Sequence, residues 1–172
     1  KNNTLMNIVL VLFFLLGISL MLYPAISNYW NSKTQSEAIV DYDKMALEMP
    51  KEDYTAYFEE ANAYNQALAK LDFPLLDYKK VGNYDDILAI SKTGMMGYLN
   101  IEKINLLLPI YHTTDESVLN VAVGHLEGSS FPVGGKNTHC VLSAHRGLPS
   151  AKLFTNLDHL GLGDTFEISV LD

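Results

Sequence analysis

The chain has 172 residues and a formal net charge of −8, with 12 Lys and Arg residues against 20 Asp and Glu residues. This length allows one domain plus an accessory segment, and the acidic balance argues against a nucleic-acid-binding surface. Because Cys140 is the only cysteine in the sequence, the chain can form neither an internal disulfide nor a metal site built from several cysteines.

An apolar segment occupies the N-terminal part of the sequence. Residues 2–32 carry no charge, and the nineteen residues 5–23 are almost wholly apolar. As a helix these nineteen residues would cover roughly 28 Å, about the thickness of the hydrocarbon core of a bilayer. Tyr29 and Trp30 follow, and such residues are typical of a membrane interface. A cleaved signal peptide is the alternative, but it needs a shorter apolar region and a small-residue cleavage site. We therefore expect residues 1–31 to form a membrane anchor with its flanks.

Two helices are predicted after the anchor. Ser32 and Gln35 have the spacing of a helix cap and capping box, and apolar residues then recur at helical spacing until Pro50 interrupts them. A second helix is expected from about residue 51 to residue 71, with an apolar stripe that contains several aromatic residues. We interpret residues 32–72 as a helical extension that packs on the main domain. A partner-binding role for the aromatic stripe is the alternative.

Residues 73–95 have a different composition, with proline, glycine and scattered charges. A short helix is expected only around residues 84–90. A long irregular segment between ordered elements is either a linker or a functional cover, and composition alone does not decide between them.

From residue 96 onward the pattern is typical of β-strands. Strands are expected at residues 97–101, 103–106 and 107–111, a short helix at 114–123, a loop at 124–135, a strand at 138–147, a helix at 150–160 and a last strand at 165–171. Pro109 favours an edge position or a bulge for its strand. About four strands are few for a closed β domain, so residues 96–172 are interpreted as the front part of a larger one.

The strand at 138–147 carries the main candidate for chemistry. His145 comes near its end, next to Arg146, the only arginine of the sequence. Histidine is the side chain that titrates near neutral pH without help from its surroundings. A histidine held at the end of a core strand and facing a groove would suit a general acid or base. We therefore expect His145 to be the catalytic residue of this chain.

Two neighbours of His145 are weaker candidates for a nucleophile. Cys140 lies five strand positions earlier, which places it on the opposite face and about 16 Å away, so it is expected to be a buried apolar filler. Ser143 shares the face of His145, but two strand positions separate side chains by about 6 to 7 Å, which is too far for direct proton transfer.

No catalytic role is expected for three other histidines, His112, His125 and His159. His125 and Glu127 could bind a metal, but no third ligand is evident, so a loop-ordering hydrogen-bond role is favoured. His112 and His159 stand at the ends of predicted elements and are expected to be solvated.

Four segments of the sequence together resemble the class C, pilin-polymerising sortases. They are residues 96–104 (Met-Gly-Tyr-Leu-Asn-Ile-Glu-Lys-Ile), 108–112 (Leu-Pro-Ile-Tyr-His), 124–130 (Gly-His-Leu-Glu-Gly-Ser-Ser) and 138–154 (Thr-His-Cys-Val-Leu-Ser-Ala-His-Arg-Gly-Leu-Pro-Ser-Ala-Lys-Leu-Phe). The anchor, the two helices and the irregular segment are also similar to the N-terminal extension of that class.

The resemblance implies a mainly β fold: a partial sortase-type β-barrel with short helices over residues 96–172, preceded by a transmembrane helix and the α-helical extension. It implies a membrane-anchored cysteine transpeptidase on the outer face of a Gram-positive cell, with pilin subunits that carry LPxTG-like sorting signals as partners. The lipid membrane would be contacted through the N-terminal helix, and no nucleic acid, cofactor or metal is expected. His145 matches the catalytic histidine of the family.

The sequence departs from the family pattern in two places. The nucleophilic cysteine and the oxyanion-stabilising arginine of the family match neither Cys140 nor Arg146, and they are expected beyond residue 172, which would leave the chain inactive alone. The aspartate-proline-aromatic lid motif of class C has no full counterpart in residues 73–95. Asp72-Phe73 and Asp77-Tyr78 both lack the intervening proline, and we favour Asp77 and Tyr78 as the lid residues.

Two other functions remain as alternatives. One is a housekeeping-type sortase that attaches proteins to peptidoglycan. The other is a non-catalytic, anchored binding module.

Overall fold

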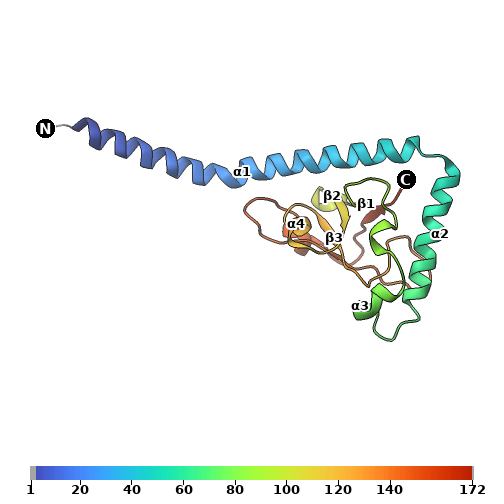
Figure 1. The fold of residues 1–172 in the computed structure, drawn as a ribbon. Coiled ribbons are helices and arrows are strands. Elements are labelled where there is room, and N and C mark those ends of the chain that lie inside the picture. The colour runs from blue at the N-terminus through green and yellow to red at the C-terminus, as the bar shows by residue number, and fades with distance from the viewer. Residues whose placement is uncertain (1–2, 172) are drawn as a thin grey trace.

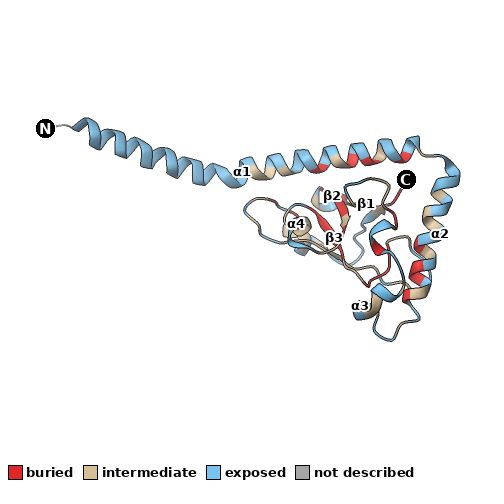
Figure 2. Cartoon of the chain, viewed as in Figure 1, coloured by how far each residue is buried: buried red, intermediate tan, exposed pale blue. Residues whose placement is uncertain are grey.

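A computed structural model describes residues 3–171 of the chain (Figure 1). It begins with one long helix, α1 (Asn3–Glu48). The N-terminal half of α1 is exposed and projects away from the rest of the molecule, and the second half lies along it (Figures 1 and 2). Pro24 lies inside α1, and the helix changes direction about midway along its length. A proline removes one helical hydrogen bond and bends the helix.

The helix start predicted at Ser32 is wrong. α1 runs through this position without a break, and the hydroxyl of Ser36 donates to the carbonyl of Ser32 over 2.9 Å. Hydroxyl side chains inside a continuous helix commonly bond back to the carbonyl four residues earlier. Ser32 therefore lies inside α1 and does not cap a second helix. The end predicted at Pro50 is confirmed, because α1 stops at Glu48.

The second half of α1 packs on the domain through a narrow stripe. Its buried residues are Gln35, Ile39, Tyr42 and Ala46, which recur at helical spacing on one face. The hydroxyl of Tyr42 donates to the carbonyl of Met96 over 2.8 Å and accepts the backbone N–H of Leu171 over 3.1 Å. One α1 side chain thus ties the first strand of the sheet to the C-terminal segment.

Helix α2 (Lys51–Leu68) follows directly after Pro50 and ends within three residues of the predicted position. Its buried residues Ala61, Tyr64, Asn65 and Leu68 face the domain, and Figure 2 shows this buried side of the helix turned inward. The interpretation of the extension as a packing element is confirmed by these contacts.

Residues 73–94 cross the molecule as short turns. They comprise α3 (Pro74–Asp77) and two three-residue 3₁₀ turns, Tyr78–Lys80 and Tyr84–Asp86. The helix predicted at 84–90 is limited to its first turn. Leu88 has a φ of 60°, and a non-glycine residue in this left-handed region ends a right-handed helix.

Within residues 3–171 the sheet has five strands: β1 (Met95–Ile101), β2 (Leu106–His112), β3 (Val123–His125), β4 (Leu142–Ser143) and β5 (Glu167–Ser169). Their order is β4-β3-β2-β1-β5. β2 and β3 are parallel, and the other pairs are antiparallel. The sheet is therefore mixed. Its central strand is β2, and its two edges are β4 and β5.

Two expectations about the first hairpin are corrected. Residues 103–106 do not continue as a strand, because Glu102–Ile104 form a 3₁₀ turn and Asn105, at a φ of 49°, closes the hairpin into β2. Pro109 lies in the central strand and not at an edge, and the alternative expectation of a bulge agrees with the register shift of the β1–β2 pair between Met95 and Gly97, next to Pro109. It pairs with Tyr98 of β1, whereas the pairing with β3 begins only at Ile110, so the missing N–H faces no partner residue of the β3 ladder.

Elements beyond residue 112 are shorter than predicted. The helix expected at 114–123 is α4 (Glu116–Leu119), and Val123–His125 form β3 beside β2 instead of helix and loop. The helix expected at 150–160 is a 3₁₀ helix, η4 (Phe154–His159), and the last strand is reduced to β5.

The strand predicted at 138–147 is paired with a neighbouring strand only at β4. Before β4, its backbone is bonded to hydroxyl side chains of the preceding loop. The N–H of His139 donates to Ser130 Oγ and the N–H of Val141 donates to Ser129 Oγ, each over 3.1 Å. The carbonyls of His139 and Val141 accept the backbone N–H groups of Ser130 and Leu126, each over 2.9 Å. The partner of this segment is therefore the loop at residues 126–130 and not another strand.

Candidate functional site

His145 lies two residues past β4, so it follows the edge strand and is not inside a longer one. It is half-buried and lies outside the hydrophobic core. Its backbone carbonyl accepts the N–H of Phe154 over 3.1 Å, and the next residue, Arg146, forms an isolated bridge with Leu153. The backbone around this imidazole is therefore fixed on both sides while the side chain keeps access to solvent, as proton transfer requires.

Arg146 holds the same loop from outside. Its Nη2 donates to Asp158 Oδ2 over 2.8 Å on the protein surface, and this hydrogen bond lowers the pKa of the Asp158 carboxyl group. The N–H of Gly147 donates to Thr155 Oγ1 over 3.1 Å. Both contacts join the loop after His145 to η4. Arg146 thus has a structural partner on η4.

Cys140 is unsuited to nucleophilic chemistry. It is a free, half-buried thiol, and burial raises its pKa to about 11. Since the thiolate is the reactive form, a thiol with this pKa stays protonated at neutral pH. The interpretation of Cys140 as a packing residue is supported.

His125 has the hydrogen-bond role that the sequence favoured over metal binding. It is fully buried. The hydroxyl of Tyr84 lies 2.8 Å from its Nδ1, and its Nε2 lies 2.9 Å from the carbonyl of Ser130. The neutral ring with its proton on Nε2 satisfies both contacts. Its ring also stacks on Phe131 at 5.1 Å and 3°, so His125 orders the loop that precedes the His145 segment.

The solvated position expected for His112 is wrong. His112 is buried, with Nδ1 2.8 Å from the carbonyl of Gly94 and Nε2 2.8 Å from the carbonyl of Ile87. The end of β2 is central in the sheet and is covered by the irregular segment, which the sequence pattern could not show. His159 is exposed, as expected.

The buried state of His125 leads to a prediction about pH. Burial lowers the pKa of its imidazole to about 4, whereas the unfolded chain has the ordinary value of about 6.5. Between these values the unfolded state binds the extra proton, so the free energy of unfolding falls as pH decreases from about 6.5 and levels off below about 4. The full loss corresponds to about 3 kcal/mol. Urea denaturation at a series of pH values measures it.

Two variants isolate the contribution of His125 from those of the carboxylates. His125→Asn should remove this part of the pH dependence, and His159→Asn, at an exposed position, should leave the wild-type curve. An unchanged slope in His125→Asn between pH 6.5 and 4 would contradict the assignment.

The two lid candidates lie on the irregular segment. Asp77 pairs with Lys80 over 2.7 Å, and the hydroxyl of Tyr78 donates to Glu127 Oε1 over 3.0 Å. These two contacts do not reach His145. They attach the segment to itself and to the loop after β3. The alternative aromatic residue, Phe73, is 65% exposed and makes no such attachment.

Asn65 supports the site from a distance, and sequence patterns did not indicate it. It is buried on α2, its Nδ2 donates to the carbonyl of Phe131 over 3.1 Å, and its Oδ1 accepts the N–H of Phe131 over 2.8 Å. The partners are 66 positions apart in sequence. An asparagine within a helical pattern is ordinarily a solvated residue, so periodicity alone could not identify it.

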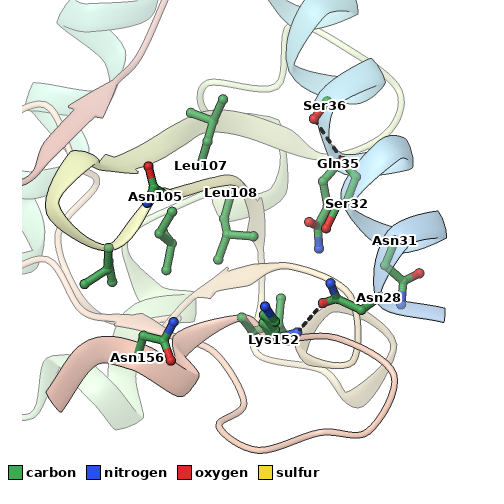
Figure 3. A pocket seen from close by; sticks show the side chains of 13 residues that line it. Asn28, Asn31, Ser32, Gln35, Ser36, Asn105, Leu107, Leu108, Lys152 and Asn156 are labelled. Carbon is green, nitrogen blue, oxygen red and sulfur yellow. Dashed lines mark hydrogen bonds between the residues drawn. The ribbon is translucent and has the colours of Figure 1, made fainter. Parts of the chain in front are cut away.

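A groove lies between α1 and the domain close to the loop after His145 (Figure 3). Its polar side chains come from three places. They are Asn28, Asn31, Ser32, Gln35 and Ser36 of α1, Asn105 of the hairpin turn, and Lys152 and Asn156 near η4. Leu106, Leu108 and Leu153 supply its apolar part.

Comparison with known proteins relates this arrangement to one family. The sortase-domain family matches residues 99–172. Sortase C1 of Streptococcus agalactiae is similar in structure with a TM-score of 0.70 and 44% identity, over 79% of this chain and 71% of that chain. Sortase C of Streptococcus pneumoniae, whose structure is described as informative on catalysis and pilin substrate specificity, has a TM-score of 0.66 and 36% identity, over 79% and 69%.

A lid mutant of the Streptococcus agalactiae sortase C1 is also similar, with a TM-score of 0.65 and 38% identity, over 77% of this chain and 69% of that chain. No curated protein sequence matches the chain. The predicted fold, a sortase-type β domain with short helices after a long apolar helix, is confirmed by these likenesses.

Proposed function

Because the chain belongs to the class C sortases, we propose that it is part of a membrane-anchored cysteine transpeptidase that joins pilin subunits. The enzyme would cleave an LPxTG-like sorting signal and link the product to a lysine of the next pilin through an isopeptide bond. The observation that carries the proposal is the placement of His145, half-buried just past the edge strand β4 and fixed by its backbone bond to Phe154.

His145 would serve both halves of the reaction. In the first half, a cysteine thiolate attacks the threonine carbonyl of the sorting signal, a thioester forms and the Thr–Gly bond breaks. His145 donates its proton to the departing glycine amine. In the second half, the lysine amine of the next pilin attacks the thioester and gives its proton back to His145. The isopeptide bond forms and the thiolate is released.

The nucleophile of this mechanism is assigned to other strands of the full-length enzyme. The raised pKa of Cys140 and the ion pair of Arg146 with Asp158 argue against these roles for the two residues. The chain spans 71% of the Streptococcus agalactiae sortase C1 chain. We therefore propose that the nucleophilic cysteine and the oxyanion-binding arginine lie on strands that follow residue 172.

The same proposal places the protein at the cell membrane. The first part of α1 is long and apolar enough to cross a bilayer, and its large apolar side chains are exposed from Leu5 to Trp30. An exposed apolar surface of this extent is stable in lipid and not in water. In the proposed topology this part of α1 spans the membrane and the catalytic domain lies outside the cell.

A direct test is to incubate the full-length enzyme with its candidate pilin and to look for products by gel electrophoresis. Ladders of high molecular mass that survive boiling in detergent are expected. The same pilin without its sorting signal is the control and should stay monomeric. Transfer of the pilin only to a peptidoglycan-stem amine, with no ladder, would replace the proposal by a housekeeping-type sortase.

We further propose that Asp77 and Tyr78 form the lid of this enzyme. The hydroxyl of Tyr78 holds the irregular segment to Glu127, and a hydrogen bond to a carboxylate contributes about 1.5 to 3 kcal/mol. Replacing both lid residues by alanine should therefore speed alkylation of the catalytic thiol by about tenfold or more. The rate is measured by mass spectrometry of the full-length enzyme with a thiol reagent in excess.

A matched double variant separates the two lid candidates. Asp72→Ala with Phe73→Ala changes the alternative pair on the same segment, and it should leave the alkylation rate unchanged. A faster rate in this variant alone would move the lid to Asp72 and Phe73, and unchanged rates in both would remove the lid claim for these four residues.

A further inference from the structure

The part of α1 that follows the apolar segment contacts the loop after His145 through two asparagines. The Oδ1 of Asn28 accepts the backbone N–H of Lys152 over 3.0 Å, as Figure 3 shows. The Nδ2 of Asn31 donates to the backbone carbonyl of Ser150 over 2.8 Å. The two side chains come from one turn of the helix and bind backbone groups two residues apart. Together they form a clamp on the outermost part of the loop.

The clamped loop starts and ends at the proposed catalytic residue. Residues 146–153 form a loop that begins directly after His145 and folds back beside it. Two contacts close the loop: the N–H of Phe154 donates to the carbonyl of His145, and Arg146 bridges to Leu153. These two contacts connect residues 150–152 to the backbone that carries the imidazole.

Leu153 makes this loop dependent on outside support. It is buried, with a φ of 37° and a ψ of −122°, a backbone region that non-glycine residues rarely occupy. Such a conformation persists only where surrounding contacts hold it. Asn28 accepts the backbone N–H of Lys152, the residue directly before Leu153.

We propose that Asn28 and Asn31 are positioning residues for His145, so that the membrane-proximal turn of the anchor helix orders the catalytic loop. The inference rests on the proposed function of His145. Asn28 comes five residues after the end of the apolar stretch 5–23, or about 7 Å along a helix. The clamp thus lies close to the membrane surface, and anchoring of α1 supports the geometry of the active site.

Opposite chemical demands at the two positions give the proposal a sharp test. Position 28 needs an acceptor and position 31 needs a donor. Asn28→Asp keeps the acceptor and should behave as wild type, whereas Asn28→Leu should release the loop. Asn31→Asp cannot donate and sets a carboxylate against the Ser150 carbonyl, so here aspartate should release the loop. The control is Tyr54→Phe, because the Tyr54 hydroxyl donates to the carbonyl of Ala46 over 2.6 Å, near the C-terminal end of α1 and outside the groove that contains Lys152.

Two measurements on the full-length enzyme in detergent micelles read the result. Hydrogen–deuterium exchange of peptides covering residues 146–154 should speed up by about tenfold or more in Asn28→Leu and Asn31→Asp, as expected for loss of a hydrogen bond. It should not change in Asn28→Asp or Tyr54→Phe. In peptide cleavage, kcat should fall by about tenfold in the two releasing variants, with KM for the sorting-signal peptide unchanged.

The outcomes separate positioning from mere stability. Faster exchange with an unchanged kcat would overturn the positioning role, and unchanged exchange would overturn the clamp itself. In a His145→Ala background Asn31→Asp should cause no further loss of kcat, and an additional loss there would show that the asparagine acts on something other than His145. If the wild-type enzyme cleaves no sorting signal, the proposed function fails, and the exchange data still decide whether the clamp exists.

Discussion

Replacing His145 by alanine should lower the rate of sorting-signal cleavage by the full-length enzyme by about 10³-fold, within the range of 10² to 10⁴ that a positioned acid or base contributes. The departing glycine amine must be protonated, and without the imidazole only water is available for this step. The half-buried position beyond β4 lets the ring meet substrate while its backbone stays fixed through Phe154. The measurement is kcat/KM from release of a fluorescent peptide fragment.

Two neighbouring residues supply controls for this prediction. His139 is an exposed histidine of the same segment, and His139→Ala should keep the wild-type rate. Cys140→Ala should also keep it, because the raised pKa of that thiol makes it a poor nucleophile. Loss of cleavage in Cys140→Ala, or a His145→Ala enzyme that retains more than a tenth of the activity, would refute the assignment of roles.

The reliable predictions came from long, regular patterns. α2 and β1 were located within a few residues because helical spacing persists over eighteen residues in one and alternation marks the other. The short strands were not located in this way, because their bounds depend on which strands they pair with. Val123 belongs to β3 through its pairing with Ile110 of β2. His139 and Val141 instead bond to backbone and hydroxyl groups of the loop at residues 126–130, which is not a strand.

The site shows the same division. His145 could be selected from the sequence, since its residue type and its place after an apolar run are local facts. Its support could not be selected, because it comes from distant residues. Asn31 lies 119 positions from Ser150, and neither asparagine of the clamp differs in the sequence from a solvated one. His112 was misjudged for the same reason, since its two carbonyl partners, Gly94 and Ile87, lie 18 and 25 positions away.

The supports of the His145 segment form a series of contacts that starts on α2. Asn65 binds both backbone groups of Phe131, and the ring of Phe131 stacks on His125. The two residues before Phe131 are Ser129 and Ser130, whose hydroxyls accept the backbone N–H groups of Val141 and His139. This series leads along the chain into β4 and so to His145. It explains why a helix of the extension matters for a site that it does not reach.

The second large effect is expected at Asn65, where leucine should lower the free energy of unfolding by about 4 kcal/mol. Leucine has a similar size, but it leaves the N–H and the carbonyl of Phe131 unpaired inside the core, and each unpaired buried group costs about 1 to 3 kcal/mol. Asn65 is only 2% exposed, so water cannot replace the lost partners. Urea denaturation of the detergent-solubilised chain, followed by tyrosine fluorescence, measures the change.

Asn62→Leu is the matched control, one turn earlier on the same helix. Asn62 Nδ2 donates to the carbonyl of Phe58 within α2 over 2.8 Å at a half-buried position, where water can take over, so its loss should cost less than about 0.5 kcal/mol. Equal stability of Asn65→Leu and Asn62→Leu would mean that Phe131 finds other partners. A large difference between them, together with faster hydrogen exchange at residues 129–141, would show that α2 stabilises the segment that carries the proposed catalytic histidine.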